Sequence, residues 1–137
     1  MSIEPAPVRF ELINDDQVRD IATVTPCGSN LIWTRANVSD KRLTWAQADE
    51  ACKACRIGGH EDWRLPTRAE LLTLVDDTRF DPAIDPIFHC KPNWYWASTP
   101  YAPSPGVCAW FVSFLSGGAF YGFRSNDGFV RAVRGGQ

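Results

Sequence analysis

The stretch Asp62–Leu71 reads DWRLPTRAEL and contains a clear signal for the start of a helix. Thr67 stands three residues before Glu70, which is the spacing of a capping box. The threonine hydroxyl accepts a hydrogen bond from the backbone N–H at position 70, and the glutamate side chain accepts one from the N–H of Thr67. The pattern predicts a helix from Thr67 to about Asp76. Its buried stripe is predicted to be Leu71, Leu72, Leu74 and Val75.

A second capping box precedes this stretch, at Thr44 and Gln47. It predicts a helix that runs to about Arg56 and stops at Gly58-Gly59. The apolar face follows helical spacing through Trp45, Ala48, Ala51, Cys52 and Cys55.

Cys52 and Cys55 form a C-x-x-C motif, but they fall on this apolar face, so we predict core residues rather than metal ligands or a redox pair. The spacing is poor for zinc, because no second C-x-x-C and no H-x-x-x-H follows. The other cysteines are Cys27, Cys90 and Cys108, and an odd total leaves at least one thiol unpaired within the chain. The disulfide state and the compartment stay open at this point.

Short apolar or alternating runs predict strands on both sides of the helices. These runs are Val8–Ile13, Val18–Val24, Leu31–Trp33, Trp94–Ser98, Ala109–Phe114, Ala119–Arg124 and Phe129–Arg134. Turn residues at Gly117-Gly118 and Asn126–Gly128 predict that the last strands form an antiparallel meander. The element order predicts an α+β fold. We divide the chain into an N-terminal extension or strand over residues 1–29 and a ligand-binding domain over residues 30–137.

The composition excludes several classes of protein. The chain has 137 residues, 45% hydrophobic and 22% charged, with 14 basic against 16 acidic side chains. Wholesale disorder is excluded, and the length fits one domain. We expect no nucleic-acid partner, because there is no basic block, and no membrane insertion, because no apolar run approaches ~20 residues. The first residues lack the apolar core of a signal peptide, and the localisation stays unknown.

The aromatic residues are concentrated near the C-terminus. The segment from Trp94 onward contains 11 of the 17 aromatic residues but only four charged ones. So short a segment cannot easily bury all of these rings, and exposed rings usually mark a binding surface.

Several motifs taken in order resemble a bacterial family, the Lcl C-terminal domain, named for the C-terminal domain of a collagen-like adhesin. The resemblance covers about Leu31 to Gln137. It is carried by Trp45, Ala48, Cys52, Gly58-Gly59, Asp62–Thr67, Glu70-Leu71, Tyr95–Thr99, Ala109–Phe114 and Val130–Gly135.

The resemblance implies a C-type-lectin-like fold, in which two helices flank a small twisted antiparallel sheet and the last strands form the ligand face. It also implies a bacterial surface, secreted or phage protein, in some cases a variable protein of a diversity-generating retroelement. Many members have a cysteine where this chain has Ala132, so the bridge from the helix to the last strand that they imply is in question here.

Enzymatic motifs are missing, and we predict no catalytic residues. Asp62, Arg64 and Glu70 are the best acid/base candidates, but such groups usually brace a turn. His60 and His89 are single histidines without a partner in the sequence. The chain has no G-x-S-x-G, H-E-x-x-H or glycine-rich phosphate loop. Formylglycine-generating oxidases share the wider fold but need a late cysteine pair, and only Cys108 lies late.

A calcium-dependent lectin site is the next alternative. Lys91-Pro92-Asn93 and Ser125–Asp127 look superficially like the calcium-binding triplets of C-type lectins. Lys91, however, places an ammonium where the ion needs a carboxylate. We therefore predict no metal and no cofactor.

Strand alternation gives the candidate site. Trp110, Val112 and Phe114 are predicted to point inward, and Trp45, Trp63, Trp96 and Trp110 are predicted to be mostly buried. The outward residues have the composition of antibody paratopes and are predicted to lie on one face. They are Phe111, Ser113, Leu115, Ser116, Gly118, Phe120, Tyr121, Phe123, Ser125, Asn126 and Asp127.

We expect this face to bind a protein or carbohydrate ligand without catalysis, with an oligomer as one option. The alternative hypotheses are that these aromatic residues fill a second small core, or that the chain is a structural tip or oligomerisation module.

Overall fold

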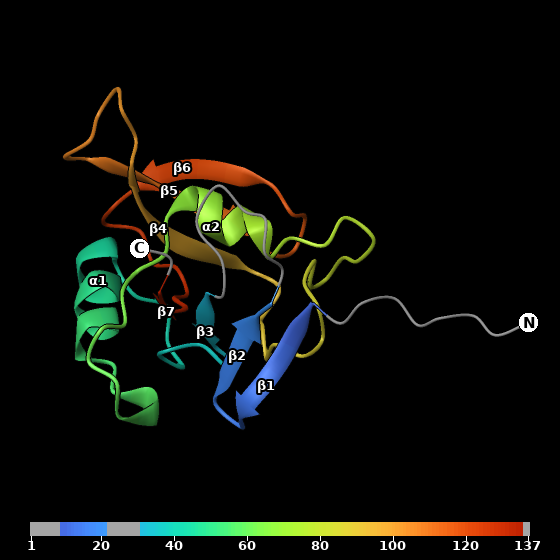
Figure 1. The fold of residues 1–137 in the computed structure, drawn as a ribbon. Coiled ribbons are helices and arrows are strands. Elements are labelled where there is room, and N and C mark those ends of the chain that lie inside the picture. Colours follow the sequence, from blue (N-terminus) through green and yellow to red (C-terminus); the bar gives the residue numbers. More distant parts are fainter. Residues whose placement is uncertain (1–8, 22–30, 136–137) are drawn as a thin grey trace, which may run out of the picture.

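The structure is a computed structural model that describes residues 9–21 and 31–135 (Figure 1). Predictions for Val8, for residues 22–24 and for Cys27 lie outside the described residues. Two helices and small antiparallel sheets confirm the α+β class. The elements are β1 Phe10–Asn14, β2 Gln17–Asp20, β3 Ile32–Thr34, α1 Trp45–Ala54, a 3₁₀ turn Ile57–Gly59, α2 Arg68–Thr73, β4 Trp94–Pro100, β5 Cys108–Ser113, β6 Ala119–Phe123 and β7 Val133–Arg134.

The strands form two antiparallel sheets, with the orders β1-β2-β3-β7 and β4-β5-β6. The prediction that residues 129–134 continue the meander beside β6 is wrong. After β6 the chain crosses to the opposite edge of the second sheet, where the N–H of Phe129 donates to the carbonyl of Trp94. It then forms β7, which pairs with β3. Gly128 permits the crossing, because a Cβ atom there would lie 3.0 Å from the Trp96 indole nitrogen.

Both predicted capping boxes are present. The helices that follow are shorter than expected at their C-terminal ends. α2 stops at Thr73, because Val75 leaves the helix to form an antiparallel bridge with Ile84. Leu71 and Leu74 are buried as predicted, and Ala48, Cys52 and Cys55 are buried on the side of α1 that faces the core.

The core consists of two clusters of buried side chains. The first surrounds Trp33, Tyr95 and Phe114, and includes Phe10 and Val18 from the first two strands. The second surrounds Trp63 and Trp96, and includes Cys52, Cys55 and Ala132. The first two strands therefore contribute to the same core as the rest of the described chain.

Of the four tryptophans predicted to be mostly buried, Trp63 and Trp96 are buried, whereas Trp45 and Trp110 stay partly exposed. Each of the partly exposed rings packs against a core cluster and also lies beneath an arginine. The Arg124 guanidinium lies 4.1 Å from the ring centre of Trp45, and the Arg68 guanidinium lies 4.2 Å from that of Trp110.

Glu70 links the N-terminal cap of α2 to Arg64, which precedes the helix. Its buried carboxylate accepts hydrogen bonds from both Nη atoms of Arg64, each at 2.7 Å, and from the N–H of Thr67 at 2.8 Å. Burial alone would raise the pKa of Glu70, but these hydrogen bonds outweigh it and hold the pKa below the ordinary value of 4.5.

We expect Glu70→Gln to lower the free energy of unfolding by about 2 kcal/mol at pH 7. The neutral amide cannot accept both charge-assisted hydrogen bonds from the Arg64 guanidinium. Since the pKa is lowered in the folded state, this stabilisation is present above the ordinary pKa of Glu70. It is lost as the pH falls through the folded pKa. Urea unfolding at pH 7 and in acid checks this, with the exposed Glu61→Gln as control. An equal difference at both pH values contradicts the prediction.

Candidate ligand-binding surface

The predicted site residues are divided between the two faces of the β4-β5-β6 sheet. Phe111 pairs with Phe120, and Trp110 pairs with Tyr121. Successive side chains of a strand point to opposite faces, so Phe120 and Tyr121 lie on different faces. The prediction of a single outward face is therefore wrong. The same alternation that was applied to β5 also governs β6.

One face carries a row of three rings across the sheet, here called the aromatic row: Trp94 on β4, Phe111 on β5 and Phe120 on β6. The ring centres of Trp94 and Phe111 are 4.1 Å apart, and those of Phe111 and Phe120 are 5.9 Å apart. The row begins against the buried Trp96, so Phe111 is half-buried rather than fully outward. Phe120, at the other end, is 49% exposed.

The glycines of this face give the rings their space. The Phe120 ring lies over Gly118, where an added Cβ would be 2.9 Å from ring atoms. The Phe111 ring similarly lies against Gly122, and the Asn126 amide lies near the same glycine. Gly118, which was predicted as a ligand contact, therefore supports a ring.

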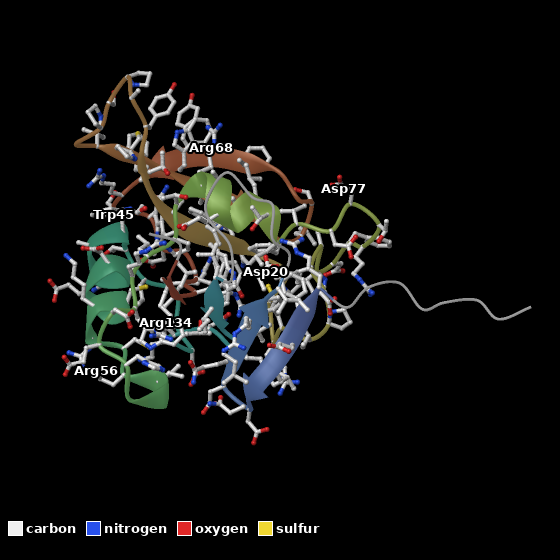
Figure 2. The ribbon with its side chains drawn as sticks, viewed as in Figure 1. Asp20, Trp45, Arg56, Arg68, Asp77 and Arg134 are labelled. Atoms are coloured by element: carbon white, nitrogen blue, oxygen red, sulfur yellow. The ribbon has the colours of Figure 1, made fainter. Side chains whose placement is uncertain are left out.

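The opposite face carries what we call the tyrosine cluster: Tyr101, Trp110, Tyr121 and Arg68. The rings of Tyr101 and Tyr121 stack at 3.8 Å with 11° between their planes. Trp110 lies edge-on to Tyr121 at 5.8 Å and beneath the Arg68 guanidinium. Figure 2 shows Arg68 at the end of α2 that adjoins this sheet.

Tyr101 and Arg68 of the tyrosine cluster were missed in the sequence, and Trp110 was predicted to point inward rather than to join the site. Tyr101 lies in the loop after β4, and Arg68 is the first residue of α2. Neither belongs to the alternating strands on which the prediction was based. Only the packing of the loop and the helix against β5 and β6 brings them to the site.

The cluster offers polar groups as well as rings. A hydrogen bond with the Tyr121 hydroxyl, together with partial burial, raises the pKa of Tyr101. The backbone N–H of Arg68 donates to the hydroxyl oxygen of Thr99. Among the described residues the Arg68 guanidinium contacts the Trp110 ring and makes no hydrogen bond or ion pair.

The remaining predicted site residues lie at the ends of β5 and β6. Ser113 is half-buried, and its hydroxyl oxygen accepts a hydrogen bond from the N–H of Leu115. Phe123 is 58% exposed and closes β6 on the edge of the sheet. The turn residues are exposed: Leu115, Ser116, Ser125, Asn126 and Asp127.

The candidate acid/base residues brace the fold. Arg64 pairs with Glu70, and Arg134 donates to the Asp62 carboxylate at 2.9 Å, which lowers the pKa of Asp62.

Burial raises the pKa of the Cys52 thiol. Cys52, Cys55, Cys90 and Cys108 are free thiols.

The described residues contain no group of three or more His, Cys, Asp or Glu side chains that could hold a metal ion. The ammonium of Lys91 lies 5.8 Å from the centre of the Phe129 ring, and the side-chain oxygen of Asn93 accepts a hydrogen bond from the N–H of Trp94.

None of the helices within residues 9–21 and 31–135 has the length and apolar character to cross a bilayer.

Comparison with known proteins gives one family. None of the curated proteins compared with this chain matches it. The family model of the Lcl C-terminal domain matches residues 22–134, which includes both helices and the whole β4-β5-β6 sheet. The match ends at the last residue of β7 and confirms the family that the motifs resemble. The chain belongs to the Lcl C-terminal domain family.

Proposed function

We propose that this domain recognises a protein or carbohydrate ligand through the β4-β5-β6 sheet near its C-terminus and does not catalyse a reaction. The observation that carries the proposal is the exposure of Phe120, Tyr121 and Phe123, at 49%, 52% and 58%. Rings that filled a second core would be buried. Three large rings in contact with water on one short strand lose little on desolvation and gain apolar area on contact with a ligand.

The tyrosine cluster is the better candidate for the main contact. Tyrosine, tryptophan and arginine are the residue types that most often dominate binding energies. The stacked pair of Tyr101 and Tyr121 is already ordered, so little side-chain entropy is lost on binding. The Arg68 guanidinium adds a positive charge and hydrogen-bond donors suited to an acidic or hydroxyl-rich group of the ligand. The aromatic row, in contrast, offers chiefly apolar contact.

The resemblance to C-type-lectin-like domains supports the same region, since it implies a ligand face on the last strands. It also supports the finer proposal of a retroelement-diversified variable protein. Exposed residues such as Tyr121, Phe123 and Asn126 can be exchanged with little effect on the core. A near-copy of the C-terminal coding sequence that differs only at adenines, beside a reverse-transcriptase gene, tests that proposal.

We expect Tyr121→Ala and Phe123→Ala each to weaken ligand binding at least about fivefold, or ~1 kcal/mol, with little change in melting temperature. Glycan and peptide arrays supply the probes, and titration of the best probe gives the affinity of each variant. Phe120→Ala is the matched control, because it removes a ring of similar exposure from the opposite face of the same strand.

Three outcomes separate the hypotheses. A loss of affinity only in Phe120→Ala moves the site to the aromatic row. Unfolding of Tyr121→Ala and Phe123→Ala contradicts the proposal, because these rings would then belong to the core. Turnover of a probe rather than reversible binding contradicts the absence of catalysis.

A further inference from the structure

Three of the four sheet edges in the described part of the chain are covered, or carry features that block pairing. On the outer edge of β4, backbone groups of the strand exchange hydrogen bonds with the backbone of Phe129. On the outer edge of β7, the backbone of Val133 exchanges hydrogen bonds with the backbone of Arg64. The free edge of β1 carries the charged Glu11 and an irregular register between Leu12 and Asn14. Charges and bulges of this kind are the usual protection of an exposed edge against pairing with another chain.

The fourth edge, on β6, has none of these protections. β6 pairs with β5 on one side, and no other described strand pairs with it; Figure 1 shows it on the outside of the molecule. Its sequence, AFYGF over Ala119–Phe123, contains no charge, no proline and no bulge. An uncharged, regular and apolar edge is a template for a further strand.

The hydrogen-bonding register identifies which backbone groups are open. Ser113 donates to the carbonyl of Gly118, and Arg124 donates to the carbonyl of Val107. In an antiparallel ladder, residues alternate between facing the partner strand and facing away from it. Phe120 and Gly122 therefore bond to β5. The N–H and C=O groups of Ala119, Tyr121 and Phe123 face the open edge, and the Phe123 carbonyl also accepts a hydrogen bond from Asn126.

The strand is complementary to itself about Tyr121. In an antiparallel pair of two copies centred there, Tyr121 faces its own counterpart, and Ala119 faces Phe123. On the other face of the sheet, Phe120 faces Gly122. Phe120 and Phe123 thus each lie opposite a small residue, whereas the two Tyr121 rings lie opposite each other. A glycine opposite an aromatic ring lets the ring pack across the strand.

We propose that the open edge of β6 pairs antiparallel with β6 of a second copy of this chain, which makes one continuous six-stranded sheet. The two Tyr121 residues exchange both backbone N–H···O=C bonds at the centre. The pairing uses the backbone edge and leaves the outer faces of the tyrosine clusters open, so each dimer presents two ligand sites on one rigid sheet. The dimer does not depend on the proposed ligand function, and each can fail without the other.

Sedimentation of the full chain from ~10 µM to ~1 mM is expected to show a monomer–dimer equilibrium. Ala119→Pro removes one N–H that faces the edge without removing a bond to β5, and is expected to weaken the dimer at least ~10-fold. Ala119→Val adds similar bulk but keeps the N–H, and is expected to stay within ~2-fold of the parent chain. A chain that remains monomeric over the whole range overturns the proposal.

Amide hydrogen exchange of the parent chain gives a second readout that does not depend on a variant folding. Between the lowest and highest concentration, the amides of Ala119, Tyr121 and Phe123 are expected to slow at least ~10-fold, while those of Phe120 and Gly122 stay unchanged. A dimer without this alternation overturns edge pairing. The protein could instead stay monomeric and show the alternating amide protection only after a strand-forming peptide is added. That result would overturn the proposal that a second copy of the chain occupies the β6 edge.

Discussion

Replacement of Trp96 by alanine is expected to lower the free energy of unfolding by about 4 kcal/mol. The indole is fully buried in the second core cluster, and its N–H donates to the carbonyl of Leu43 at 2.9 Å. The ring also fills the space against Gly128, where the chain crosses from the second sheet to the first. The substitution therefore leaves a large cavity and also leaves a carbonyl without its donor.

Urea unfolding followed by circular dichroism measures this loss. Trp94→Ala is the matched control, since Trp94 lies two residues away on β4 and is only half-buried at the start of the aromatic row. The control is expected to lose about half as much stability. Equal losses in the two variants contradict the assignment of Trp96 as the central residue of this cluster.

Replacement of Arg131 by methionine is expected to cost about 3 kcal/mol, although methionine fits a buried site better by hydrophobicity. Arg131 is fully buried. One of its Nη atoms donates to the carbonyls of Thr34 and Arg35, and the other donates to that of His89 at 3.1 Å. The guanidinium also lies 5.0 Å from the centre of the Phe88 ring.

The cost arises because carbonyl groups from two distant segments lose the guanidinium donor in the interior, although the Arg35 carbonyl keeps the N–H of His89. Arg134→Met, three residues later in the same motif, is the control. The ion pair of Arg134 with Asp62 lies at the surface, and such pairs contribute less than about 1 kcal/mol. Thermal or urea unfolding of the two variants should therefore differ clearly. A loss in Arg131→Met no greater than in the control contradicts this role for the carbonyl contacts.

The helix starts were predictable because a capping box is a local device. Thr44 with Gln47 and Thr67 with Glu70 satisfy backbone donors within one turn of chain, and both boxes form as expected. The helix ends were less predictable, since α2 stops where Val75 finds a partner at Ile84, nine residues farther along the chain.

The exposure of the rings on β6 was predictable, but their grouping with other residues was not. The exposure of Phe120, Tyr121 and Phe123 agrees with an outward prediction for each of them. Their division between two faces follows from strand alternation alone, whereas the register of β6 on β5 decides which residue of β5 each ring lies beside. The stacking of Tyr101 on Tyr121 and the position of Arg68 over Trp110 depend on a loop and a helix that approach from elsewhere in the fold.

The sequence by itself determined what short-range physics controls: the two capped helices, the alternating strands β5 and β6, and a C-terminal segment with more rings than a small core can hold. The tertiary structure alone decided which partner each distant segment takes. Phe129 joins β4, and Val133 joins β3, rather than continuing beside β6. The reason is that an unpaired strand has no local preference among edges. The pairing depends on where Trp96, Gly128 and Arg131 can be buried and hydrogen-bonded together.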